Sequence, residues 1–155
     1  MRYFAPLVRT AALTVLVDQS TKYFVVHAMN LKALGAIDVL PPYVQFRMAW
    51  NAGVNFGIPL AGKWVLVGLA VAICGAIVWW LMRDRPGLPM LVSAGLVIGG
   101  AVGNVIDRLI YGAVADFLNL SCCGWRNPWS FNVADIAIFV GAFGLIVLGT
   151  RTGRR

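Results

Sequence analysis

The sequence predicts an all-α membrane protein with four transmembrane helices and a small extracytoplasmic β-sheet or loop subdomain between helices 1 and 2. Two observations lead to this class. Of the 155 residues, 60% are hydrophobic and only 12% are charged, and the mean hydropathy is +0.80, which the surface of a soluble domain would not tolerate. Crossing the hydrocarbon core takes about 20 helical residues, so the chain holds four or five spans and little else.

The spans are expected at residues 10–29, 64–82, 88–108 and 133–150, within a single domain of residues 1–155. The second span is uncharged, and the third is uncharged until Asp107. The first span contains Asp18, Lys22 and His27, and this polar content argues against the plain apolar core of a cleaved signal peptide. We regard His27 as an interfacial residue rather than a ligand.

The arginines predict the orientation of the spans. Four spans place both termini on one side, and the ends that share this side carry most of the arginines, namely Arg2, Arg9, Arg83, Arg85, Arg151, Arg154 and Arg155. By the positive-inside rule this side is cytoplasmic, which leaves residues 30–62 and 109–132 outside. The net charge of +7 therefore reflects topology. Because no basic patch is interleaved with aromatic residues, we expect no nucleic-acid partner.

The first outer segment contains a predicted strand in "YVQFRMAWN". Val44, Phe46, Met48 and Trp50 alternate with polar residues, as in a strand with one wet face. A small sheet on the membrane surface would suit this pattern.

Two helical patterns concern packing and charge. Gly95, Gly99 and Gly103 form a stripe of small residues that lets another helix approach closely. Asp18 and Lys22 are four residues apart, in the better order for an ion pair on one helix face. Whether they form a structural pair or contact a substrate stays open at this point, since ionisable residues within spans are functional candidates.

Polar residues gather at the outer ends of the third and fourth spans. Arg108 is expected to compensate the helix dipole with Asp107 as its partner, and Asn132 with Asp135 resembles a capping box at the start of the fourth span. Both helix ends lie on one face, so they confine a set of polar side chains to one edge of the bilayer: Asn104, Asp107, Arg108, Asp116, Asn132 and Asp135. Two close carboxylates in a low-dielectric cleft can share a proton, activate water and protonate a leaving amine.

Other chemistries lack their residues. One histidine and no glutamate are too few for a His-rich zinc site, and no glycine-rich phosphate loop is present. A Ser-Lys dyad using Ser20 or Ser130 stays open. Cys74, Cys122 and Cys123 form no CxxC pair, which disfavours a quinone-linked thiol oxidoreductase. A small proton-coupled transporter with four helices is the principal alternative function.

Five blocks in order resemble the lipoprotein signal peptidases, or signal peptidase II, which are bacterial membrane aspartic proteases. The blocks are "DQSTK" at 18–22, "NAGVNF" at 51–56, "GGAVGNVIDR" at 99–108, "VADF" at 114–117 and "FNVAD" at 131–135. Each block is weak alone, but five in register are specific, and they extend over most of the chain.

The resemblance implies that Asp116 and Asp135 are the catalytic pair. It implies that the following residues line or support the site: Asp18, Lys22, Asn51, Asn104, Asp107, Arg108 and Asn132. The implied substrate is a prolipoprotein whose lipobox cysteine carries diacylglycerol, cut just before that cysteine at the outer face of the bacterial inner membrane. The implied partners are membrane lipid and globomycin-like inhibitors. No metal or cofactor is expected, and we expect a monomer.

The chain departs from the family pattern in two places. Asn55 stands where the family usually has Ala or Ser, which affects the shape of the outer loop. Cys122 and Cys123 lie between the two catalytic blocks, where the family has no requirement for cysteine, so we regard them as local variation.

Overall fold

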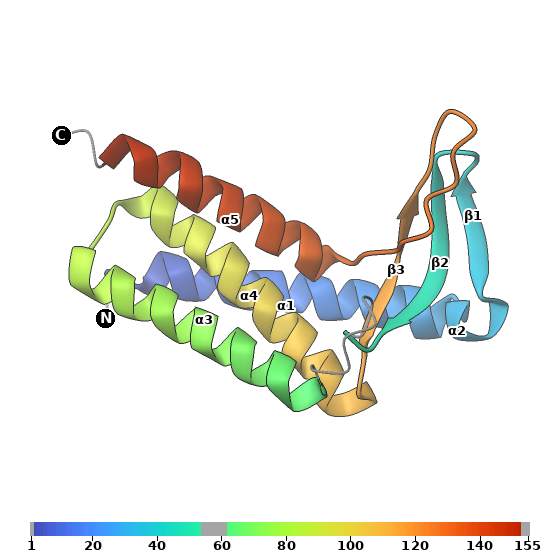
Figure 1. Cartoon of the computed structure of the whole chain (residues 1–155), viewed down its shortest axis with the longest axis horizontal. Helices are drawn as coiled ribbons and strands as arrows, with labels where there is room; N and C mark the ends of the chain where they lie inside the picture. Colours follow the sequence, from blue (N-terminus) through green and yellow to red (C-terminus); the bar gives the residue numbers. More distant parts are fainter. Residues whose placement is uncertain (1, 54–61, 153–155) are drawn as a thin grey trace.

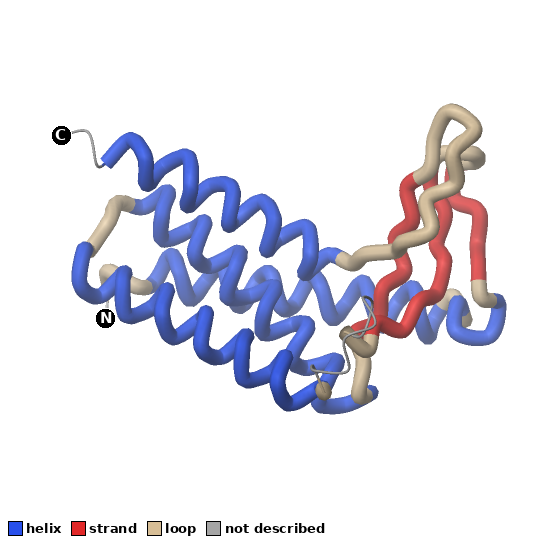
Figure 2. Tube along the Cα trace, in the orientation of Figure 1, coloured by secondary structure: helices blue, strands red, loops and turns tan. Residues whose placement is uncertain are grey.

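The computed structural model describes residues 2–53 and 62–152, in which long helices carry a small sheet at one end (Figures 1 and 2). The long helices are α1 (Ala5–Lys22), α3 (Lys63–Asp84), α4 (Leu88–Tyr111) and α5 (Val133–Thr152). A π-helical turn, η1 (Tyr23–Ala28), continues α1, and the short α2 (Leu31–Leu34) follows it. Asn55 and Phe56 of the "NAGVNF" block lie outside the described residues.

The apolar character of the helices agrees with a membrane protein. Among the described residues, α3 and α4 are long and apolar enough to cross a membrane, and Val133–Gly149 form a shorter apolar helix. Helix α3 exposes large apolar side chains such as Trp64, Val71 and Trp79. Exposed apolar surface along a whole helix would be costly in water and is ordinary in lipid.

Helix α4 is the centre of the bundle, and the glycine stripe explains how it packs. A Cβ at Gly99 would approach the Ala11 carbonyl oxygen of α1 to 2.7 Å, and one at Gly95 would approach the Leu7 carbonyl oxygen to 2.8 Å. On the neighbouring face, a Cβ at Gly100 would approach the Ala134 carbonyl oxygen of α5 to 2.5 Å. The predicted close helix approach is therefore confirmed, and α1 and α5 flank α4.

The sheet consists of β1 (Ala36–Leu40), β2 (Val44–Asn51) and β3 (Val114–Leu120), in that order and antiparallel. The strand predicted in the first outer segment is confirmed as β2. Assigning the sheet wholly to the segment between helices 1 and 2 was incomplete, because β3 follows α4. Strand β3 is buried on nearly all its residues, so it lacks the alternation that marks a strand with one wet face.

Only part of the apolar face predicted for β2 packs against the core. Phe46 and Met48 pack on a core cluster with Val25, Leu31 and Phe117. The register between β2 and β3 then shifts between Phe46 and Ala49. Beyond this irregularity Trp50 is 41% exposed. A bulge bends a strand and re-aims its side chains, which ends the simple alternation.

Candidate active site

Asp135 lies in the first turn of α5, where it forms the predicted capping box with Asn132. The Asn132 side-chain oxygen accepts from the Asp135 backbone N–H at 3.0 Å, and the Asp135 carboxylate accepts from the Asn132 backbone N–H at 3.2 Å. The second carboxylate oxygen of Asp135 accepts from Asn104 Nδ2 at 2.9 Å. The cap thus fixes this carboxylate beside α4 without using all of its acceptor capacity.

Asp116 lies on β3 and is only 3% exposed. Its carboxylate accepts from Asn132 Nδ2 at 2.6 Å and from Asn51 Nδ2 at 3.1 Å. Asn132 therefore contacts both carboxylates. Burial, followed by the nearby Asp135 carboxylate, raises the pKa of Asp116 from 3.8 to about 6, while the hydrogen bonds from Asn51 and Asn132 and the charge of Lys22 oppose the rise.

A buried charge triad supports the pair. Lys22 Nζ lies 2.8 Å from a carboxylate oxygen of Asp18 and 2.8 Å from one of Asp107. These ion pairs join α1 to α4 at the end of the bundle that carries the sheet. The ion pair expected between Asp18 and Lys22 is therefore present, with Asp107 as a third member. Lys22 Nζ also donates to the Asn104 side-chain oxygen at 3.3 Å.

The triad holds the backbone immediately before each aspartate of the pair. The Ala115 N–H, which precedes Asp116, donates to Asp107 at 3.1 Å. The Ala134 N–H, which precedes Asp135, donates to Asp18 at 2.9 Å. Both acceptors are carboxylates bound to Lys22, so one ionic unit positions β3 and the start of α5. Charge-assisted bonds of this kind are the strong ones.

A purely structural account made Asp107 the partner of Arg108, but the Asp107 carboxylate forms its ion pair with Lys22 and accepts from the Ala115 N–H. Arg108 Nη1 instead donates to the Asn104 backbone oxygen at 3.2 Å. Among the described residues, Arg108 Nε is buried without a hydrogen-bond partner. Its guanidinium lies within electrostatic range of Asp116, Asp135 and Asp107. A side chain on the last turn of a helix can turn back onto that helix as readily as toward its sequence neighbour.

Gln19 is a site residue that sequence reasoning missed. Its Nε2 donates to Asp18 at 3.1 Å and to Asp107 at 3.0 Å, so it joins the same two acids that Lys22 joins, and at Asp18 it shares the oxygen that Lys22 contacts. Its place beside Asp18 in "DQSTK" was the available signal. A neutral amide is not an ionisable residue, so a search of the sequence for charged site residues passes over it. Its N–H groups nevertheless donate to carboxylate oxygens that would otherwise lack a hydrogen bond.

The contacts of the other candidates bear on the alternatives. Ser130 Oγ donates to the Arg47 backbone oxygen at 3.0 Å, whereas Lys22 is held in its two ion pairs, so Lys22 is not a free base for a Ser-Lys dyad. His27 is exposed, with Nε2 3.4 Å from the Tyr111 hydroxyl. Within residues 2–53 and 62–152, no group of three or more His, Cys, Asp or Glu side chains is placed to hold a metal ion.

The fold and the site define a class: an integral membrane enzyme with two neighbouring carboxylates at the end of its helix bundle. The family model for signal peptidase (SPase) II matches residues 10–150. The chain therefore belongs to the signal peptidase II family of peptidases. This assignment gives no support to the transporter alternative.

Individual relatives agree with the family. The chain is 42% identical to the lipoprotein signal peptidase of Methylobacterium sp. (strain 4-46), over 89% of this chain and 84% of that protein. It is 40% identical to that of Pseudoalteromonas atlantica (strain T6c / ATCC BAA-1087), over 88% and 84%. A solved bacterial membrane enzyme, determined by the in meso method at 1.9 Å, has a TM-score of 0.80 at 28% identity and covers 92% of this chain and 90% of its own.

Proposed function

We propose that this peptidase removes the signal peptide from diacylglyceryl-modified prolipoproteins by cutting before the lipidated cysteine, with Asp116 and Asp135 as the catalytic pair. The observation that carries the proposal is the double contact of Asn132. Its side chain donates to Asp116, and its backbone donates to Asp135. Two carboxylates held by one residue, one with a raised pKa, can divide the roles of acid and base between them.

The proposed reaction follows from this division. Asp116 holds the proton, and Asp135 is ionised. Asp135 accepts a proton from water as the water oxygen attacks the scissile carbonyl carbon, and Asp116 gives its proton to the carbonyl oxygen. The tetrahedral diol then collapses, the C–N bond breaks, and the leaving amine takes the proton from Asp135 while a diol hydroxyl returns one to Asp116. The pair ends as it began, and no cofactor takes part.

The neighbouring residues have supporting roles in this proposal. Asn51 lies at the end of β2, the central strand, and donates to Asp116, so a substrate segment held extended beside this end of the strand would pass the pair. Asn104 and Asn132 hold the carboxylates, and Arg108 supplies positive charge where an oxyanion develops. Asp18, Lys22 and Asp107 position the backbone and do not touch substrate. Globomycin-like peptides would compete for the same site.

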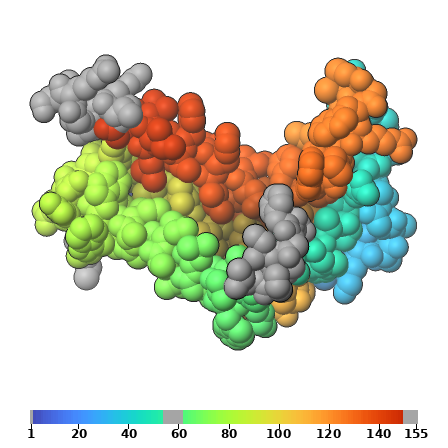
Figure 3. All heavy atoms as spheres, in the orientation of Figure 1, coloured from blue at the N-terminus to red at the C-terminus, as the bar shows by residue number. Residues whose placement is uncertain are grey.

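We further propose that all four long helices span the bacterial inner membrane as a single domain, with both termini cytoplasmic and the pair at the extracytoplasmic face. The sheet lies at the end of the bundle where α1 ends and α5 begins, and the outline is concave where α5 meets it (Figures 1 and 3). A lipidated precursor already in the bilayer would reach this edge by lateral diffusion. Every residue that we place at the site comes from one chain, which fits a monomer.

The experiment uses purified protein and three forms of one precursor: diacylglyceryl-modified, unmodified, and with the lipobox cysteine changed to alanine. Only the modified form should be cut, and mass spectrometry should place the new amino terminus on the lipidated cysteine. Equal cleavage of the unmodified form would contradict the proposed substrate, and cleavage elsewhere would contradict the proposed position.

A further inference from the structure

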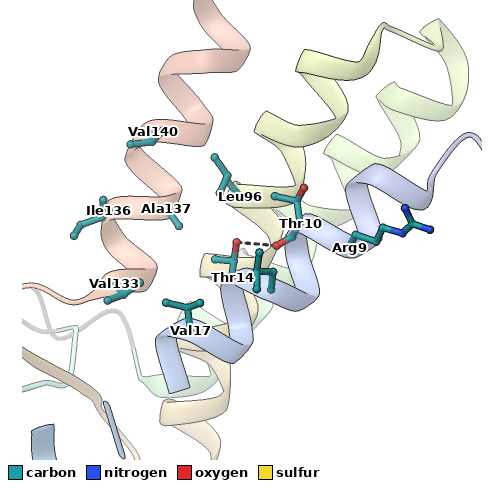
Figure 4. Close-up of a pocket in the computed structure, with 10 residues that line it drawn as sticks. Arg9, Thr10, Thr14, Val17, Leu96, Val133, Ile136, Ala137 and Val140 are labelled. Carbon is teal, nitrogen blue, oxygen red and sulfur yellow. Dashed lines mark hydrogen bonds between the residues drawn. The ribbon is translucent and has the colours of Figure 1, made fainter. Parts of the chain in front are cut away.

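A groove of about 490 Å³ lies between α1 and α5, with Leu96 of α4 at its floor (Figure 4). Its walls are mostly aliphatic, with Leu13 and Val17 on α1 and Ile136 and Val140 on α5. Leu13 is 60% exposed and Val140 is 51% exposed, so these walls face outward. None of the residues of the catalytic pair or the charge triad lines the groove.

The groove follows from the way α4 packs. Helix α1 rests on α4 at Gly95 and Gly99, and α5 rests on it at Gly100. These contacts lie on different faces of α4, so α1 and α5 contact the same helix from two directions and leave Leu96 uncovered between them. A furrow of this origin is fixed by backbone contacts, and side-chain rotation alone does not close it.

The groove has one charged end. Arg9 lines it near the start of α1, and the described lining residues otherwise carry no charge. Val17 lies eight positions after Arg9 on α1, which is about 12 Å along the helix axis. The shape is therefore a narrow apolar furrow with a single cation at one end.

This charge pattern selects among possible occupants. A signal peptide carries positive charge at its own amino-terminal end, which would lie beside Arg9 and be repelled by it. A second copy of this chain would bring basic residues to the same end, since α1 begins and α3 ends there (Figure 1), and Arg2 precedes α1 while Arg83 and Arg85 lie at the end of α3. The acyl chains of the substrate end in methyl groups, which form neither an ion pair nor a hydrogen bond with Arg9. A phospholipid with an anionic headgroup matches both the charged end and the apolar walls of the groove. Its phosphate can pair with Arg9, and its acyl chain can lie against the aliphatic side chains.

We propose that the groove between α1 and α5 binds one anionic phospholipid, with its phosphate at Arg9 and an acyl chain along Leu13, Val17 and Ile136. In the proposed orientation this lipid comes from the cytoplasmic leaflet, which carries anionic lipid. The site is separate from the peptidase reaction and does not depend on which residues cut the substrate.

The test is native mass spectrometry of the full chain in detergent, with equal amounts of phosphatidylglycerol and phosphatidylcholine that have identical chains. Wild type should retain phosphatidylglycerol about fivefold more than phosphatidylcholine, the size expected for one cation beside an anionic headgroup. Arg9→Gln should abolish this preference, and Arg9→Lys should keep most of it. Arg2→Gln is the matched control, because Arg2 is an exposed cation that does not line the groove, and it should behave as wild type.

A second variant tests the furrow itself. Ile136→Trp adds volume from a wall position that is 42% exposed, and it should lower retention of both lipids. Equal retention of the two lipids by wild type would overturn the proposal. So would an unchanged preference in Arg9→Gln, or an equal loss in Arg2→Gln, which would indicate diffuse attraction. Displacement of the lipid by lipidated precursor, or retention that requires a dimer, would assign the groove to another occupant.

Discussion

The charge triad gives a prediction that a simple Asp18–Lys22 pair does not. Lys22 faces two carboxylates at equal distances of 2.8 Å, so the triad carries a net charge of −1 when all three groups are ionised. Lys22→Met leaves two buried carboxylates with no countercharge. Asp18→Asn leaves Lys22 paired with Asp107, and its amide oxygen can still accept from Ala134. The lysine variant should therefore be much the more harmful.

The magnitudes follow from burial, since the side chains of Lys22, Asp18 and Asp107 are 6%, 0% and 1% exposed. Removing one partner of a buried ion pair costs about 3–5 kcal/mol, which we assign to Lys22→Met. Removing one acid from a triad that stays paired should cost about 1–3 kcal/mol, the scale of a disturbed charged hydrogen bond. The double variant Lys22→Met with Asp18→Asn has one fewer stranded carboxylate, so it should be more stable than Lys22→Met alone.

The assay is thermal unfolding of the purified variants in one detergent. At roughly 2–4 °C per kcal/mol for a chain of this size, Lys22→Met should lower Tm by roughly 6–20 °C. Asp107→Asn is the matched control for Asp18→Asn and should cost about as much. Equal losses for Lys22→Met and Asp18→Asn, or strict additivity in the double variant, would contradict a shared ionic unit.

Three further predictions concern other parts of the molecule. Because burial raises the pKa of Asp116 from 3.8 to about 6, its contribution to stability is full well below the unfolded-state pKa of 3.8 and is lost as pH rises through about 6. At about 1.4 kcal/mol per pKa unit, the stability of Asp116→Asn relative to wild type should rise by about 3 kcal/mol between about pH 3 and pH 8. A difference that does not change with pH would contradict the shift. Exposed Cys122 and Cys123 changed together to Ser should keep most peptidase activity, and a loss beyond about tenfold, roughly 1.4 kcal/mol in the barrier, would give them a role. A single cysteine introduced near Arg85 should be shielded from an impermeant thiol reagent in intact cells, while one near Lys32 should react, and the reverse pattern would invert the proposed topology.

Sequence alone predicted the elements that repeat a simple period or composition. The helices at 64–82 and 88–108 are apolar runs, and α3 and α4 contain them. The Gly95–Gly99–Gly103 stripe is a spacing rule, and its helix contacts are as expected. The capping box of Asn132 and Asp135 is a local motif, so neighbouring residues suffice to define it.

Sequence alone missed the features that depend on distant contacts. Strand β3 is buried on both faces, so its residues do not alternate. Asp107 joins Lys22 across 85 positions of the chain, and the adjacent Arg108 was the wrong partner because a sequence shows only neighbours along a helix. The role of Gln19 depends on two acids from different helices. These assignments need the packing of α1 on α4, which no local pattern contains.

The catalytic pair is tested most directly by precursor cleavage with Asp116→Asn, Asp135→Asn, the double variant and Ser130→Ala. Asparagine keeps the shape but removes the group that accepts or donates the proton. Each single aspartate change should abolish cleavage while precursor still binds, and the double change should cost little more, since residues that act as a unit are not additive. Ser130→Ala should cut at near the wild-type rate. Substantial cleavage by Asp135→Asn together with its loss in Ser130→Ala would contradict the aspartic mechanism.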